Sequence, residues 1–179
     1  MDLQDFNGDG LYFDAPLAPE VAACLDAAAQ QYSQGTAEQP LLAAQALAPD
    51  DLCVLVGLYR FYYYQHRYQD ALLIAERVMA VVGPRLGLPT RWSDLCRADL
   101  AVAASRGIGL LRFFLLALKG AGYLSLRLGR FEQGKAMLAT VVALDADNRL
   151  GARLLLDVLA ANDAEIVPFP AATPTEIRP

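Results

Sequence analysis

The sequence predicts an all-α fold in which helical hairpins stack side by side. A pattern of small and apolar residues occurs three times, the second copy 34 residues after the first and the third 63 residues after the second. Proline, glycine and aspartate also interrupt the chain at intervals that suit short helices. A 34-residue unit of paired helices cannot bury its apolar face alone, so such units stack. The matching positions are Cys24, Leu25, Ala28, Gln34, Ala37, Leu41 and Ala44; then Leu58, Tyr59, Tyr62, Tyr68, Ala71, Ala75 and Val78; then Ala121, Gly122, Ser125, Phe131, Gly134, Leu138 and Val141.

The first copy predicts helices over residues 19–32 and 37–47. Pro19 and Glu20 favour a helix start, because proline is tolerated in the first turn and an acidic side chain complements the helix dipole there. Pro49 follows the second helix, which it cannot continue. The first hairpin therefore ends just before the second copy of the pattern.

The second copy predicts helices over residues 51–65 and 68–82. Either Asp50 or Asp51 can cap the first of these, because a side-chain oxygen there accepts hydrogen bonds from the free backbone N–H groups of the first turn. The dipeptide Gly83-Pro84 is expected to end the second helix.

The spacing of 63 residues before the third copy indicates an insertion over residues 86–114. Part of the insertion, residues 91–105, predicts an extra helix. A long helix is then expected over residues 107–128, followed by a turn at Gly129 and a helix over residues 132–144. The third hairpin is formed by the last two of these helices.

These elements predict one domain, which the length of 179 residues also favours. A stack of this kind needs a capping helix at its open end. The expected organisation is an irregular lead-in over 1–17, repeats over about 18–51, 52–85 and 115–148, an insertion over 86–114, a cap over 149–161, and a proline-rich extended or flexible tail over 162–179.

The period of paired helices resembles the tetratricopeptide-repeat family over about two-thirds of the chain. In that family the two helices of a unit meet through small residues, and here Ala71, Gly122 and Gly134 hold those positions. A large side chain there would force the helices apart at a cost of about 1–3 kcal/mol. Tyr59 departs from the pattern and would have to point into a gap, such as one made by the insertion. An irregular helical bundle with accidental periodicity is the alternative.

Composition argues against several classes of partner. The net charge of −5 opposes nucleic-acid binding, because phosphate contacts need dense positive charge. No uninterrupted apolar run approaches the roughly 20 residues of a membrane span, and the best stretch, residues 108–118, contains Arg112. The N-terminus lacks the basic and apolar regions of a signal peptide, and three cysteines without an obvious pairing fit a reducing compartment. We expect a cytoplasmic protein.

The resemblance also implies a binding surface, because the first helix of each tetratricopeptide unit lines a concave groove. Arginine and tyrosine often dominate the energetics of interfaces, and together they favour an acidic, partly apolar partner segment. We expect Tyr63 and Tyr64 to be exposed and Tyr59, Phe61 and Tyr62 to be buried, the alternative being that the whole aromatic run is core. The expected partner-binding residues are Arg60, Tyr63, Tyr64, Lys119, Tyr123, Arg127 and Trp92, with a core role as the alternative for Trp92.

No group of residues indicates an enzyme, a metal site or a bound cofactor. His66, the single histidine, has no acid or nucleophile near it in the sequence and is expected to form a hydrogen bond in a turn. The segment Asp5–Gly10, with Asp5, Asn7 and Asp9 at alternate positions, looks like the start of a calcium loop. However, Pro16 stands where such a loop needs a bidentate glutamate, so a glycine-rich turn is the favoured interpretation.

Residues 10–14, 59–67 and 110–123 resemble a family of small tetratricopeptide-type proteins encoded with bacterial nitrogen-fixation genes. The resemblance implies a non-catalytic assembly factor that docks on the molybdenum–iron protein of nitrogenase during cofactor maturation or repair. The alternative is a generic chaperone or scaffold whose groove binds an acidic peptide. The groove does not reproduce the carboxylate clamp of chaperone-binding members, because Gly120 stands where that clamp needs a long cation.

Overall fold

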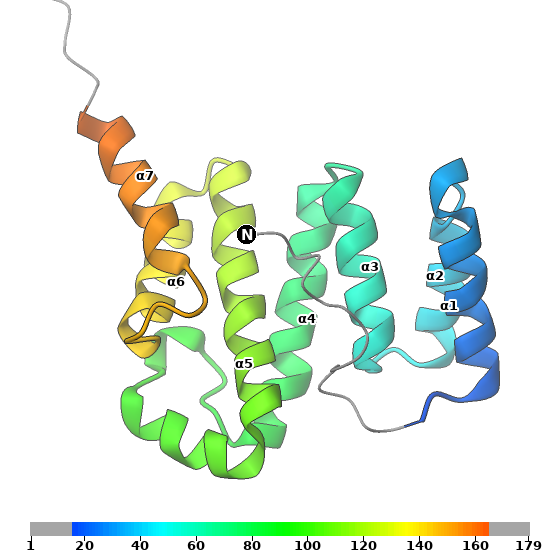
Figure 1. Ribbon diagram of the computed structural model, residues 1–179, viewed down its shortest axis with the longest axis horizontal. Helices are drawn as coiled ribbons and strands as arrows, with labels where there is room; N and C mark the ends of the chain where they lie inside the picture. Colours follow the sequence, from blue (N-terminus) through cyan, green and yellow to red (C-terminus); the bar gives the residue numbers. More distant parts are fainter. Residues whose placement is uncertain (1–15, 165–179) are drawn as a thin grey trace, which may run out of the picture.

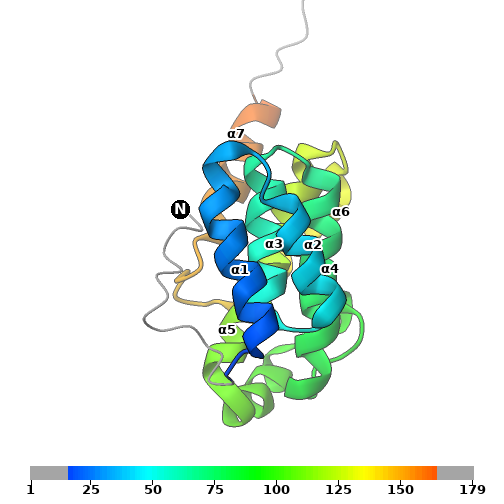
Figure 2. The same ribbon diagram turned by 90° about the vertical axis from the view of Figure 1, so that its right-hand side faces the viewer.

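The computed structural model describes residues 16–164, and within this range every regular element is a helix, which confirms the all-α prediction. The α-helices pack against their sequence neighbours from α1 to α7. Figures 1 and 2 show two layers, with α1, α3, α5 and α7 in one and α2, α4 and α6 in the other. The elements are α1 (Pro19–Gln31), η3 (Tyr32–Gln34), α2 (Glu38–Leu47), α3 (Leu52–Tyr64), α4 (Tyr68–Leu86), η4 (Trp92–Asp94), α5 (Arg97–Arg127), α6 (Phe131–Leu144) and α7 (Ala152–Ala164).

Side chains next to the helix ends explain where several helices start. α1 begins at Pro19, as predicted. The carboxylate of Asp51 accepts hydrogen bonds from the backbone N–H of Cys53 at 2.9 Å and of Val54 at 3.1 Å. The predicted cap of α3 is therefore confirmed, and Asp51 rather than Asp50 provides it.

The predicted end of α4 at Gly83-Pro84 is wrong, because the helix continues to Leu86. Gly83 and Leu86 are buried, so packing against neighbouring helices keeps the last turn helical despite the proline. The helix ends instead at Gly87, whose φ of 69° is the left-handed conformation common after a helix. The guanidinium of Arg106 occupies the space that a Cβ at Gly87 would need.

The helix predicted over residues 91–105 starts later than expected, since η4 comes first and α5 begins at Arg97. The start is set by a capping box in which the backbone N–H of Cys96 donates to the Asp99 carboxylate at 2.8 Å. The expected separation between this helix and the next is only a kink inside α5. Gly107 has extended dihedral angles there, with φ 169° and ψ 99°.

Glycines allow α5 and α6 to approach each other closely. A Cβ at Gly134 would lie 2.7 Å from the side chain of Leu126 and 2.8 Å from the carbonyl oxygen of Gly122. A Cβ at Gly122 would lie 3.2 Å from the carbonyl oxygen of Gly134. Ala71, at the matching position of α4, is fully buried. The expectation that small residues line these helix contacts is confirmed.

The end of the stack differs from the predicted cap over 149–161. Asp145 holds a turn before α7, because its carboxylate accepts from the backbone N–H of Arg149 at 3.0 Å and of Leu150 at 2.7 Å. α7 therefore begins at Ala152, and it continues to Ala164. Residues 162–164, predicted as part of the tail, belong to this helix. The remaining tail and the lead-in over 1–15 lie outside the described residues.

α5 is long and apolar enough to cross a membrane by length and composition alone. The sequence did not predict this, because charged residues interrupt the apolar stretches of the helix. In the structure its backbone is kinked at Gly107, and it packs against both α4 and α6. Phe114, Leu118 and Leu124 on this helix belong to the core. The apolar side chains in the second half of α5 therefore pack in the core of the stack.

Candidate functional site

The structure brings most of the predicted partner-binding residues together on two neighbouring helices of one layer. Arg60, Tyr63 and Tyr64 lie on α3, while Tyr123 and Arg127 lie on α5. Figure 1 shows α3 and α5 in the same layer, with α4 behind them. These residues form two adjoining features, a cluster of tyrosines near the C-terminal ends of α3 and α5 and an apolar pocket closer to their middle.

The tyrosine cluster comprises five rings that are centred on Tyr63. Its ring centroid lies 6.2 Å from Tyr123, 6.3 Å from Tyr68, 5.5 Å from Tyr64 and 6.2 Å from Tyr59, with which it is stacked. Aromatic pairs at such distances stabilise a fold beyond the area that they bury. The cluster therefore ties α3, α4 and α5 together near the C-terminal ends of α3 and α5.

Arg127 covers part of this cluster. Its Nη1 donates a hydrogen bond to the Tyr123 hydroxyl at 2.9 Å, and its guanidinium carbon lies 4.5 Å from the centre of the Tyr68 ring. Cation–π contact and hydrogen bonding hold the side chain in one place while its charge stays exposed. The predicted grouping of Arg127 with tyrosines is thus present, and Tyr68 is a member that the sequence reasoning did not include.

Tyr63 and Tyr64 are half-buried, so the expectation that both are exposed is wrong. Both rings pack against other tyrosines, which shields part of their surface. Burial is the main cause, and a hydrogen bond with Tyr123 the second, of a rise in the pKa of Tyr63 to about 12. Phe61 and Tyr62 are buried as predicted, whereas Tyr59 is half-buried.

The unusual position of Tyr59 is explained by Gly120. A Cβ at Gly120 would lie 2.7 Å from the Tyr59 hydroxyl oxygen, so the missing side chain on α5 makes the room that Tyr59 occupies. Burial raises the pKa of Tyr59 well above its usual range, which keeps the phenol neutral. The gap expected for Tyr59 thus exists, but a glycine on α5 provides it and not the insertion.

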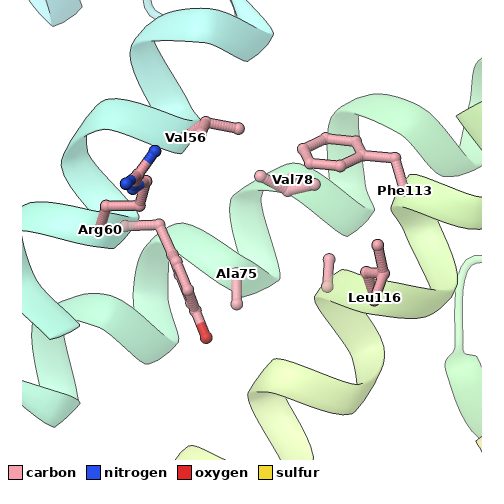
Figure 3. A pocket seen from close by; sticks show the side chains of 8 residues that line it. Val56, Arg60, Ala75, Val78, Phe113 and Leu116 are labelled. Carbon is pink, nitrogen blue, oxygen red and sulfur yellow. The ribbon is translucent and has the colours of Figure 1, made fainter. Parts of the chain in front are cut away.

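An apolar pocket opens beside the tyrosine cluster, between α3, α4 and α5 (Figure 3). Of the side chains that line it, Arg60 alone is charged. Val56, Arg60 and Leu116 are half-buried and thus within reach of a partner. The lining residues are Val56, Tyr59, Arg60, Ala75, Val78, Phe113, Leu116 and Ala117.

Several lining residues, Val78 and Phe113 among them, were missed by the sequence reasoning, which considered only the first helix of each pair and only part of α5. Phe113 lies three residues before Leu116, so helical spacing alone could have extended the groove face to it. Val78 comes from α4, the second helix of its pair. Its contribution depends on the packing of three helices and has no local signal.

Lys119 is turned toward the end of the stack. Its Nζ donates a hydrogen bond to the backbone carbonyl of Leu150 at 2.6 Å, just before α7. Burial lowers its pKa, although the Asp145 carboxylate acts in the opposite sense. This cation therefore helps to fix the connection from α6 to α7, in addition to any contact with a partner.

Trp92 lies apart from the other candidates, in η4. It is half-buried and packs against the core, and η4 contacts α6. The structure thus places Trp92 in the packing of the insertion and does not bring it to the groove formed by α3, α4 and α5.

The described residues contain no group of three histidine, cysteine or acidic side chains that could hold a metal ion. The calcium-like segment Asp5–Gly10 lies outside this range.

His66 has a positive φ of 57° in the turn between α3 and α4, and its Nδ1 lies 2.8 Å from the Tyr68 hydroxyl. The expected role of His66 as a hydrogen-bonded turn residue is confirmed. Burial raises the pKa of the Cys53 thiol, which opposes nucleophile formation there.

Comparisons with known proteins give one informative relative. No protein-family model matches the chain, and no solved structure matches it. The relative is described as an "uncharacterized 19.8 kDa protein in nifW 5′ region" of Azotobacter chroococcum mcd 1, and it is 73% identical over 179 residues, with both chains covered in full. At this level of identity and coverage, the chain belongs to the same family as that Azotobacter protein.

Proposed function

We propose that this protein is a non-catalytic binding factor of nitrogen fixation that docks on a larger metalloenzyme, the molybdenum–iron protein of nitrogenase, while the cofactor of that enzyme is being matured or repaired. The proposed architecture is a tetratricopeptide-like stack acting in the bacterial cytoplasm. The single observation that carries the protein-binding part is the apolar pocket with Arg60 at its edge, next to a surface of tyrosines and Arg127.

The packing supports a tetratricopeptide-like arrangement. Consecutive helices pair as α1 with α2, α3 with α4, and α5 with α6, and the paired helices lie in two layers (Figure 2). Small residues stand where the third pair makes its closest contact. In such stacks the layer of first helices forms an extended binding surface, and here that layer holds Arg60, Tyr63 and Tyr123.

The chemistry of the groove supports a protein partner more than a small-molecule substrate. Burial of a partner's apolar side chain against the apolar lining of the pocket would stabilise the complex by about 25 cal/mol per Å² of apolar surface removed from water. The ion pairs among the described residues do not include Arg60, so an acidic group beside the apolar side chain of a partner would complement it. Tyrosine and arginine are also the residue types most enriched among energetically dominant interface positions.

The nitrogenase part of the proposal is supported by the relative. The Azotobacter protein is described as lying in the nifW 5′ region, and the two chains are alike over their whole length. This location supports a role in nitrogen fixation for the shared family. The choice of the molybdenum–iron protein as the partner comes from the sequence resemblance described above.

Capture from extracts of nitrogen-fixing Azotobacter cells tests the proposal. The tagged full chain, an Arg60→Glu variant and an Arg153→Glu control would be compared, since Arg153 is an exposed cation on α7, outside the groove. We expect the wild type and the control to recover the molybdenum–iron protein, with more from cofactor-deficient cells, and Arg60→Glu to recover at least about tenfold less. Absence of nitrogenase components from the wild-type capture would refute the named partner.

The second candidate, a scaffold that binds an acidic peptide in the groove, is favoured by the same pairing of Arg60 with apolar neighbours. It predicts that Arg60→Glu and Arg127→Glu weaken the binding of acidic, aromatic peptides whatever their origin. Equal affinity of the charge-reversed protein for such peptides would count against it.

A further inference from the structure

The first fifteen residues of the chain differ in charge from the part that the structure describes. Residues 16–164 hold fourteen acidic and fourteen basic side chains, so they are neutral overall. Residues 1–15 hold four acidic side chains and no basic one, and they also include three aromatic rings. These acidic and aromatic residues are Asp2, Asp5, Phe6, Asp9, Tyr12, Phe13 and Asp14.

The aromatic and acidic side chains of residues 1–15 complement the apolar and cationic lining of the pocket. The pocket offers apolar side chains from three helices and one cation, Arg60, at its edge (Figure 3). An aromatic ring in the pocket and a carboxylate on Arg60 would satisfy both features. Residues 1–15 carry aromatic and acidic side chains within a few positions of each other, for example Asp5 beside Phe6 and Phe13 beside Asp14.

The first described residues also lie close enough to the pocket for residues 1–15 to reach it. α1 runs in the same direction as α3, because Leu25 lies 3.7 Å from the Cβ position of Gly57 and the Tyr32 ring packs 6.2 Å from that of Phe61. The chain therefore enters near the N-terminal end of α3. The pocket residue Val56 lies four residues into that helix, which is about 6 Å along its axis. Fifteen residues can extend up to about 50 Å, so they can reach the pocket with chain to spare.

We propose that residues 1–15 bind in the apolar pocket of their own molecule, with an aromatic ring against Val56 and Leu116 and an aspartate paired with Arg60. This inference rests on the same groove as the proposed function but does not depend on who the partner is. A tethered segment acts at an effective concentration on the order of millimolar. An external partner must then displace it, so the segment sets a threshold for partner binding.

The test uses a labelled peptide of residues 1–15 and four full-length proteins. These are the wild type, a segment variant (Phe6→Ser/Tyr12→Ser/Phe13→Ser), the segment variant with Arg60→Gln, and the segment variant with Arg153→Gln as the matched control. Circular dichroism checks that each protein keeps its helical content. We expect the peptide to bind the segment variant and the control, to bind the wild type about tenfold more weakly or worse, and to lose binding with Arg60→Gln.

Equal peptide affinity for the wild type and the segment variant would overturn the inference, and so would an absence of binding to both. Light scattering covers a further outcome: a dimer of the wild type that becomes a monomer in the segment variant would place the segment in a second copy, against the intramolecular inference. The two proposals fail separately. Peptide binding without recovery of nitrogenase would refute only the proposal that the partner is nitrogenase. Recovery of nitrogenase without peptide binding would refute only the proposal that residues 1–15 bind in the pocket.

Discussion

Substitution of Gly134 by alanine tests the contact on which the third helical pair depends. The new Cβ would lie 2.7 Å from the Leu126 side chain and 2.8 Å from the carbonyl oxygen of Gly122. Leu126 can move, but the carbonyl belongs to the backbone of α5, so the two helices must separate. Overpacking of this kind costs about 1–3 kcal/mol, and alanine returns about 0.5–1 kcal/mol through its better helix propensity. We expect a net loss of about 1–2 kcal/mol in the free energy of unfolding.

The assay is urea unfolding followed by circular dichroism, with Gly57→Ala as the matched control. Gly57 is also a packed helical glycine, in α3, but a Cβ there would meet only the terminal carbons of Leu41 at 3.1 Å and Leu25 at 3.7 Å, which can move. We expect the control to be neutral or slightly stabilised, because it gains propensity without a backbone clash. In a chain of this size each kcal/mol moves the melting temperature by about 2–4 °C. A Gly134→Ala protein as stable as the wild type would refute the close contact between α5 and α6.

Three further predictions concern single side chains. Gly120→Ala should lower stability by about 1–2 kcal/mol, because the clash of its Cβ with the Tyr59 hydroxyl at 2.7 Å outweighs the better helix propensity of alanine, and adding Tyr59→Phe should restore most of the loss; failure of that rescue in thermal unfolding would contradict the assigned contact. Asp51→Ala should cost about 1 kcal/mol through loss of the α3 cap, whereas Asp50→Ala should cost less, and urea midpoints that rank the two in the other order would contradict the assignment. The pKa of Tyr63 is raised from 10.0 to about 12 in the folded state, so its contribution to stability is complete below pH 10 and is lost as the pH rises through 12. Tyr63→Phe should therefore reduce the loss of stability between pH 10 and pH 12, and urea midpoints with the same pH dependence in both proteins would contradict the shift.

Features set by one local side chain could be predicted from the sequence. Pro19 and Asp51 each determine a helix start through their own chemistry, and both starts are found where expected. The close contact through Gly122 and Gly134 was also predictable, because the resemblance to the tetratricopeptide family assigns both to positions where small residues let the two helices of a unit meet.

Features that depend on distant packing could not be predicted in this way. α4 continues through Pro84 because its last turn is buried by other helices, which no local rule anticipates. Lys119 points to the carbonyl of Leu150 because the chain folds back before α7, and that turn depends on Asp145. Similarly, the resemblance to the tetratricopeptide family implied that α3 and α5 share one surface, but the contribution of Val78 to the pocket required all three helices.

Site-specific photo-crosslinking tests most directly the central claim that the groove between α3, α4 and α5 holds a protein partner. A photoreactive residue would replace Val56 in the pocket or, as a control, Leu73, which is exposed on α4 and does not line the pocket. With purified, cofactor-deficient molybdenum–iron protein, the account predicts crosslinks to that protein from position 56 and few from position 73. Crosslinks from position 73 alone, or from neither position, would contradict the claim.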